Sequence, residues 1–289
     1  MSIDFKNIKT PYLIAEIGIN HNGDLQLAKK LIDAASACQW DCVKFQKRDP
    51  DISVPEHQKN IMRDTPWGRM TYLDYKKRLE FGKKEFDYID QYCKEKPIDW
   101  TASVWDIPSL RFIANYNVPF VKIPSAQMAN KELVLESCKT GKPLVVSTGM
   151  SSVEEIDEVV DILEKNASQY ILLHCNSAYP TPKDELNLNC IKFLQEKYKR
   201  PVGYSGHECD LDPTVYSTVL GVRLIERHIT LDHAIWGTDQ ASSLEPMGMD
   251  MLRKRIKDID AILGNGVKRV TNNEVPVRKK LRGDDYHTI

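Results

Sequence analysis

Residues 11–24 read PYLIAEIGINHNGD, and they place polar side chains where a buried strand should end. Residues 11–17 form a short apolar run that predicts a strand, with Glu16 as its one carboxylate. A buried carboxylate needs a cationic partner or a polar cavity. The polar residues 20–24 then predict a turn, with Asp24 as the N-cap of a helix. A strand with polar groups at its carboxyl end is typical of the active site of a (β/α)8 barrel.

The same alternation of apolar strand and amphipathic helix continues along the chain. We expect strands near residues 11–17, 41–46, 98–103, 119–123, 143–148, 169–174, 200–204 and 222–228. We expect helices near residues 24–38, 84–96, 106–116, 130–140, 152–165, 184–198, 210–219 and 249–263. Eight such units predict an α/β fold with a closed parallel sheet, the (β/α)8 TIM barrel. The alternative, an open doubly wound sheet, requires a GxGxxG loop after an early strand, and the sequence has none there.

Two segments depart from the regular alternation. Residues 47–82 form a long insertion after the second strand, and a connection of this length favours a lid over a site or a subunit contact. Residues 266–289 are mostly polar and too few for another independently stable domain. We therefore expect a barrel at residues 1–265, followed by a C-terminal tail at 266–289 without a second domain.

Composition excludes several classes of protein. A chain of 289 residues suits an α/β barrel, which typically needs roughly 250. The formal net charge of −1 gives no electrostatic reason to expect binding to nucleic acid or to an anionic membrane. No apolar stretch approaches the ~20 residues of a membrane helix, and the polar start does not resemble a signal peptide. Seven cysteines without a CxxC pair indicate a reducing, cytoplasmic location.

Two histidines are the best metal-ligand candidates. His207 follows the seventh predicted strand and His228 ends the eighth. Adjacent barrel strands bring their carboxyl ends together, so the two imidazoles can share one ion. Imidazole nitrogen suits manganese, iron, cobalt or zinc better than magnesium. The alternative is one buried histidine with its hydrogen bonds satisfied and one surface histidine.

Two lysines within apolar strands predict an anion site. Lys44 and Lys122 would be costly to bury unless each meets a negative group. Near the barrel mouth they would converge on an anion, with hydroxyl groups completing a cradle for phosphate and carboxylate. The hydroxyl candidates are Ser125, Ser147, Ser177 and Ser205. The alternative is that Lys44 pairs with Glu16 and that Lys122 reaches solvent.

Seven collinear motifs resemble the sialic acid synthase family, which condenses phosphoenolpyruvate with an aldose to a 3-deoxy-2-keto sugar acid. They are IAEIGINHNGD at residues 14–24, VKFQ at 43–46, VKIPS at 121–125, VSTGM at 146–150, HC with YPTP at 174–182, GYSGH at 203–207 and ERH at 226–228. Each motif alone is weak, but seven in order at predicted strand ends are a specific signal. Many family members continue into a small antifreeze-protein-like domain, which we do not expect in this chain.

The resemblance implies roles for particular residues. His207 and His228 match the ligands of a divalent metal, usually manganese, with magnesium or cobalt as alternatives, and Asp239 matches an aspartate near the metal-bound water. Glu16 matches a catalytic glutamate whose proton role is open, and Lys44 a lysine beside the acceptor. Positions implied to bind substrate are Ser103, Lys122, Ser125, Ser147, Ser177, Tyr179 and Ser205; Ser177 replaces the asparagine of the best-known members.

The resemblance also implies a mechanism and an assembly. C3 of phosphoenolpyruvate attacks the aldehyde of the aldose, water attacks C2, and phosphate leaves by C–O cleavage. Metal and lysine polarise the carbonyl as an alkoxide develops. The expected partners are phosphoenolpyruvate, an aldose and a second copy of the chain in a homodimer. The product is a sialic-acid-like acid for surface polysaccharide.

The acceptor is where this sequence departs from the family. Gln127 stands where the family has a glutamate that binds acceptor hydroxyls, and it lacks that charge. The expected absence of the C-terminal domain also removes an arginine that reaches the acetamido group. Both make N-acetylmannosamine a doubtful acceptor. One alternative resembles Kdo-8-phosphate synthase, with a phosphate subsite formed by residues such as Arg48, Lys59, Arg63 and Arg69; the other is a non-catalytic sugar-binding barrel.

Overall fold

The computed structural model describes residues 3–283, and its central element is a closed parallel barrel of eight strands. The strand order around the barrel is β1-β10-β9-β8-β7-β6-β5-β2. The strands are β1 (Tyr12–Gly18), β2 (Cys42–Lys47), β5 (Asp99–Val104), β6 (Val121–Ile123), β7 (Leu144–Ser147), β8 (Tyr170–Cys175), β9 (Val202–Gly206) and β10 (Leu224–His228). The predicted (β/α)8 fold is confirmed, and the open doubly wound alternative is wrong because β1 pairs with both β2 and β10.

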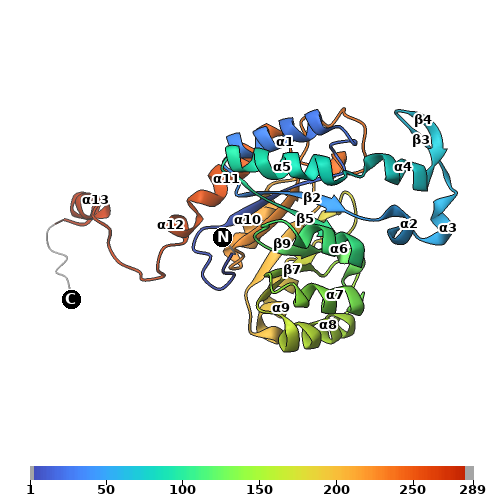
Figure 1. Ribbon diagram of the computed structural model, residues 1–289. Coiled ribbons are helices and arrows are strands. Elements are labelled where there is room, and N and C mark those ends of the chain that lie inside the picture. The colour runs from blue at the N-terminus through green and yellow to red at the C-terminus, as the bar shows by residue number, and fades with distance from the viewer. Residues whose placement is uncertain (1–2, 284–289) are drawn as a thin grey trace. The chain divides into compact units, whose positions relative to one another are not determined.

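Helices follow the strands and surround the barrel (Figure 1). They are α1 (Leu25–Ala37), α5 (Lys83–Glu95), α6 (Ile107–Ala114), α7 (Lys131–Lys139), α8 (Val153–Asn166), α9 (Asn189–Tyr198), α10 (Asp212–Val219) and α11 (Pro246–Lys257). Asp24 caps α1 as predicted, because its carboxylate accepts the backbone N–H groups of Gln26 and Leu27. Ser152 and Glu155 form a capping box at the start of α8.

The period of two along each strand separates two cores. Outward residues such as Leu13, Val43 and Ile225 pack against the helices in the main hydrophobic cluster. Inward residues form a smaller cluster within the barrel, which comprises Phe5, Ile14, Cys42, Phe120, Val145, Ile171, Leu173 and Leu224. Two positions further along several of these strands the inward residue is polar. The apolar inner cluster therefore forms the floor beneath a polar layer at the carboxyl ends of the strands.

The predicted insertion folds as a small unit of its own at the end of β2. It contains α2 (Pro50–Ser53), α3 (Glu56–Lys59), an antiparallel hairpin of β3 (Met62–Thr65) and β4 (Gly68–Thr71), and α4 (Tyr72–Leu79). Figure 1 shows it extending in the direction in which β2 points. Tyr75 and Leu79 of α4 pack with Ile19, directly after β1. The insertion thus lies beside the carboxyl end of the barrel.

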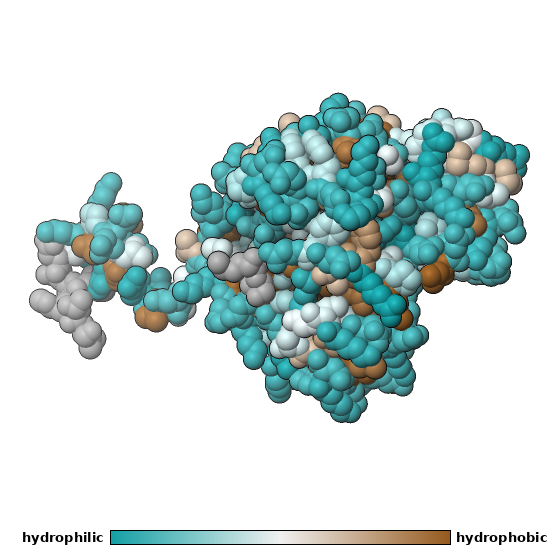
Figure 2. Space-filling view, viewed as in Figure 1, coloured by the Kyte–Doolittle hydropathy of each residue, from teal (hydrophilic) through white to brown (hydrophobic). Residues whose placement is uncertain are grey.

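The part of the chain that the structure describes divides between Lys257 and Asp258 into two compact units. The second contains α12 (Ile259–Leu263) and α13 (Glu274–Arg282), whose described residues are almost all exposed. Across residues 3–283, none of the helices combines the length and apolarity that a membrane crossing requires. In the first unit, the face seen in Figure 2 is mostly hydrophilic, and its apolar residues are scattered in small patches. All seven cysteines are free thiols.

Candidate active site

A cavity of about 210 Å³ lies at the carboxyl ends of the barrel strands. All the site residues predicted from the sequence line it, except Gln127 and Asp239. The predicted residues that line it are Glu16, Lys44, Ser103, Lys122, Ser125, Ser147, Ser177, Tyr179, Ser205, His207 and His228. Unpredicted polar groups also line it, notably those of Gln46, Trp105, Cys175 and Glu226.

The strand register explains why these side chains meet. Glu16 on β1 lies opposite Lys44 on β2 and opposite His228 on β10. Ser205 on β9 lies opposite Glu226 on β10. Paired residues in neighbouring parallel strands point to the same face of the sheet, which here is the barrel interior. Residues more than 200 positions apart in the sequence therefore share one layer.

Lys44 is the centre of one buried cluster. Its Nζ lies 2.5 Å from Glu16 Oε2, 2.5 Å from Ser103 Oγ and 3.6 Å from Glu226 Oε1. The other oxygen of Glu16 accepts a hydrogen bond of 3.1 Å from Gln46 Nε2. The Lys44–Glu16 pair, considered from the sequence as an alternative to an anion site, is thus present inside the cavity.

Lys122 forms the second cluster and does not reach solvent, so that part of the alternative is wrong. Its Nζ donates to Ser147 Oγ at 2.7 Å and lies 3.8 Å from Glu226 Oε2. Ser205 Oγ donates to Glu226 Oε1 at 3.2 Å. Glu226 was not predicted as a site residue. Its position two residues before His228 in one strand was the available signal, because residues i and i+2 share a face.

The two buried carboxyl groups have different acidities. Burial raises the pKa of Glu16 to about 7, with the ammonium group of Lys44 opposing that rise. Burial also raises the pKa of Glu226, but the ammonium groups of Lys122 and Lys44 outweigh it and lower the pKa to about 2. Glu226 therefore stays ionised, whereas Glu16 can gain or lose a proton near neutral pH. Two neighbouring carboxyl groups with such different pKa values are typical of acid–base sites.

His207 and His228 are brought together with their ring centroids 5.3 Å apart, and both are buried. His207 Nδ1 donates to the carbonyl oxygen of Asn176 at 2.7 Å, which leaves its Nε2 free to act as an acceptor. His228 Nδ1 is buried without a hydrogen-bond partner, and the nearest carboxylate oxygen, Asp239 Oδ2, is 3.6 Å away. Burial lowers the pKa of His228 to about 3, so this ring is the neutral form that binds metal ions.

The two histidines are the predicted metal-ligand candidates that the cavity lining contains. Across residues 3–283, no group of three or more histidine, cysteine, aspartate or glutamate side chains has the arrangement of a metal site. Asp239 Oδ2 lies 3.6 Å from His228 Nδ1, but Asp239 does not belong to the cavity lining. Gln127 ends a short 3-10 helix, Ser125–Gln127, and its Oε1 accepts from Asn130 Nδ2 at 3.0 Å. The structure therefore does not bring the Gln127 side chain into the cavity.

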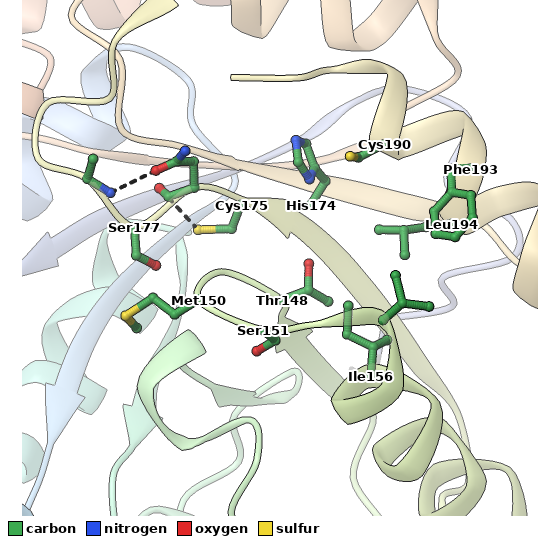
Figure 3. A pocket seen from close by; sticks show the side chains of 13 residues that line it. Thr148, Met150, Ser151, Ile156, His174, Cys175, Ser177, Cys190, Phe193 and Leu194 are labelled. Atoms are coloured by element: carbon green, nitrogen blue, oxygen red, sulfur yellow. Dashed lines mark hydrogen bonds between the residues drawn. The ribbon is translucent and has the colours of Figure 1, made fainter. Parts of the chain in front are cut away.

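A second cavity of about 560 Å³ adjoins the first and shares Met150, Cys175 and Ser177 with it. Figure 3 shows apolar side chains of α8 and α9 on one side and hydroxyl groups of Thr148, Ser151 and Ser177 nearby. Its lining contains no lysine, arginine, aspartate or glutamate. The larger cavity therefore lacks the cations that an anionic substrate needs.

A buried ion pair outside the barrel holds the segments that carry the histidines. Arg227, between Glu226 and His228, is fully buried and faces outward. Its Nη1 lies 3.0 Å from Oε1 of Glu208, the residue after His207. This pair was not predicted, because only the packed structure shows that the two charges are adjacent.

Comparison with known proteins identifies the family. Residues 31–268 match the NeuB family. The chain belongs to the NeuB family. One relative in this family is an N-acetylneuraminate-9-phosphate synthase of Drosophila melanogaster, which is 35% identical over 98% of this chain and 75% of its own length. Another is an N,N'-diacetyllegionaminic acid synthase of Legionella pneumophila, which is 33% identical over 94% of this chain and 79% of its own length.

Similarity to a solved structure supports the same assignment. The N-acetylneuraminic acid synthetase of Leptospira borgpetersenii, in complex with citrate, has a TM-score of 0.84 and 31% identity, with 98% of each chain covered. The predicted resemblance to sialic acid synthases is confirmed, and so is the predicted class of activity. The chain is a phosphoenolpyruvate-dependent synthase of sialic-acid-like sugar acids.

Proposed function

We propose that the polar layer of the barrel binds phosphoenolpyruvate and an aldose and joins them at the mouth. The observation that carries this assignment is the pair of buried lysines, Lys44 and Lys122, each hydrogen-bonded to a serine and each beside a carboxylate. Two buried ammonium groups in one small cavity form a strong site for a substrate with both phosphate and carboxylate groups. A non-catalytic barrel would not require a glutamate whose pKa is raised to about 7 beside them.

Lys122 is assigned to phosphoenolpyruvate. Its ammonium group and the Ser147 hydroxyl already form a hydrogen bond at the cavity floor. Ser125, Ser177 and Ser205 add hydroxyl groups around the same cavity. These groups would hold the phosphate and carboxylate and would orient C3 of the enol toward the mouth.

Lys44 and Glu16 are assigned to the reacting centre. C3 of phosphoenolpyruvate forms a bond to the aldehyde carbon, and the aldehyde oxygen gains negative charge and then a proton. Water adds to C2, the C2–O bond to phosphate breaks, and inorganic phosphate leaves. Lys44 supplies positive charge near the developing alkoxide, and Glu16 holds or accepts a proton at its carboxyl group.

His207 and His228 are assigned to a divalent ion, with manganese as the first choice and magnesium or cobalt as alternatives. The residues fit this role, since both rings are buried, one has a free Nε2, and the other has an unpartnered Nδ1. Two imidazoles with Asp239 nearby form a nitrogen and oxygen donor set that such ions accept. A bound ion would supply Lewis acidity at the acceptor carbonyl.

The proposal extends to location and assembly. Seven free thiols suit a reducing cytoplasm. The insertion at residues 47–82 borders the mouth, where it can serve as the predicted lid or as the contact of a homodimer. The relatives are named for products with and without a terminal phosphate, so both phosphorylated and unphosphorylated aldoses are candidate acceptors.

The test is release of inorganic phosphate from phosphoenolpyruvate in the presence of a panel of aldoses and a divalent ion. We expect release with at least one aldose and formation of a 3-deoxy-2-ulosonic acid in equal amount. Lys122→Met should raise KM for phosphoenolpyruvate by about tenfold to a hundredfold, because a charge-assisted hydrogen bond is lost. Lys131→Met, at an exposed lysine that pairs with Glu158, is the matched control and should leave KM unchanged. Absence of aldose-dependent release throughout the panel would contradict the proposal.

A further inference from the structure

Three cations of the insertion region gather around aromatic rings beside the cavity. Lys76 Nζ of α4 lies 5.2 Å and 5.5 Å from the ring centroids of Tyr72 and Tyr75. The guanidinium carbon of Arg63, on β3, lies 4.9 Å from the Tyr72 ring. That of Arg48, directly after β2, lies 5.0 Å from the ring of Trp105, which lines the catalytic cavity.

A chain of hydrogen bonds connects one of these cations, Arg48, with the reacting centre. Arg48 Nη2 donates to Gln46 Oε1, and Gln46 Nε2 donates to Glu16 Oε1 at 3.1 Å. On the other side, the Tyr75 ring packs edge-on to Trp236 at 5.3 Å, and Trp236 belongs to the loop between His228 and Asp239. The cations therefore lie at the outer end of the mouth, farther from the barrel floor than Glu16.

The cations are incompletely neutralised. Arg48 pairs with Glu80 at 2.6 Å, and Lys47 Nζ lies 3.7 Å from the same carboxylate. One negative charge is therefore shared by two cations. Within residues 3–283, neither Lys76 nor Arg63 has a carboxylate oxygen within ion-pair distance.

Burial and the nearby Arg48 lower the pKa of Lys76 to about 8, so its ammonium group lacks adequate compensation. The charged groups that act on it are Arg48, Arg63, Asp239 and Glu80, and the rings that contact it are those of Tyr72 and Tyr75. An anion placed among the three cations would relieve this excess of positive charge.

We propose that Arg48, Arg63 and Lys76 bind a phosphate monoester at the end of the acceptor aldose distant from its aldehyde. This inference rests on the proposed function, because it assumes that the aldehyde lies beside Glu16 and Lys44. A phosphate dianion offers three oxygens to donors from different directions, and two guanidinium groups and one ammonium group match that need. Lys59, considered from the sequence for such a subsite, pairs with Glu56 at 2.7 Å instead.

The binding test uses a probe that cannot react. Sorbitol 6-phosphate and sorbitol differ only in the phosphate and have no aldehyde, so calorimetry of each with the full chain reports binding alone. We expect the phosphate to strengthen binding, and Lys76→Met to weaken the binding of sorbitol 6-phosphate by about tenfold to a hundredfold. Lys77→Met is the matched control, since Lys77 is the next residue of α4 and pairs with Asp51 at 2.8 Å on the surface. It should bind the probe as the unaltered chain does.

The kinetic test compares kcat/KM for N-acetylmannosamine 6-phosphate with that for N-acetylmannosamine, and for arabinose 5-phosphate with that for arabinose. We expect the phosphorylated acceptor of a pair to be preferred, and Lys76→Met and Arg63→Gln to remove the preference without lowering kcat/KM for the unphosphorylated sugar. Equal use of both forms, or an equal loss for both in Lys76→Met, would overturn the subsite while leaving the synthase activity intact. If no aldose supports phosphate release, the proposed function fails, and the calorimetric comparison still decides whether the phosphate subsite exists.

Discussion

The buried Arg227–Glu208 pair offers the sharpest test of how the structure supports its site. Arg227 Nη1 donates to Glu208 Oε1 at 3.0 Å and to Thr214 Oγ1 at 2.8 Å. Glu208 also accepts from Tyr204 at 2.9 Å and from Thr214 at 2.7 Å, and it is 1% exposed. Arg227→Met keeps an unbranched side chain but removes every charge-assisted bond to this carboxylate.

The expected loss in the free energy of unfolding is about 3–5 kcal/mol, since Glu208 would keep a buried charge without its partner. The loss should also reach the site. Glu208 follows His207 and Arg227 precedes His228, so both histidine segments would lose a common anchor. We therefore expect weaker retention of a divalent ion in Arg227→Met than in the unaltered chain.

Urea unfolding measures the loss in the free energy of unfolding, and two further variants serve as controls. Arg255→Met removes an arginine that pairs with Asp212 at 2.7 Å on the surface, and it should change stability by less than about 1 kcal/mol. The double variant Arg227→Met/Glu208→Gln buries no unpaired charge, so it should be more stable than Arg227→Met alone. A loss below about 1 kcal/mol for Arg227→Met, or no recovery in the double variant, would refute the reasoning.

Three further predictions concern the site itself. Glu16→Gln should leave the Kd for phosphoenolpyruvate, measured by calorimetry, within about twofold of its original value. It should lower kcat, measured by steady-state kinetics, by about a hundredfold or more. An unchanged kcat would remove Glu16 from the proton chemistry. Chelation should abolish phosphate release, and a divalent ion should restore it. His207→Ala or His228→Ala should lose metal retention and turnover together. Full activity of either variant in the presence of chelator would exclude the metal role. Affinity for sorbitol 6-phosphate should be highest near pH 7 and fall as pH rises through about 8, because the pKa of Lys76 is lowered to about 8 and its ammonium group is lost over this range. The phosphate, with a second pKa of about 6, stays dianionic over the same range. A Lys76→Met variant should lack this dependence, and the same decline in both proteins would assign it to another group.

Local pattern determined much of this protein. Eight alternations of apolar strand and amphipathic helix specified the barrel, because the periods of two and about 3.6 residues depend only on near neighbours in the sequence. Polar residues inside apolar runs, such as Glu16, Lys44, Lys122 and His228, pointed to the site for the same reason. A charge at an inward position of a buried strand has few places to go except the barrel mouth.

Tertiary structure decided what those patterns left open. Glu226 entered the site because barrel closure places its inward position on β10 beside Ser205 on β9 and within 3.8 Å of Lys44 on β2 and Lys122 on β6. Gln127 instead bonds with Asn130. Lys76 has the sequence pattern of an ordinary solvated lysine on a helix, next to the surface residue Lys77. Its two tyrosine neighbours lie on the same helix, but only the folding of the insertion against the barrel placed its charge near Arg48 and Asp239. Electrostatic interactions depend on distance in space and on burial, and neither follows from separation along the chain.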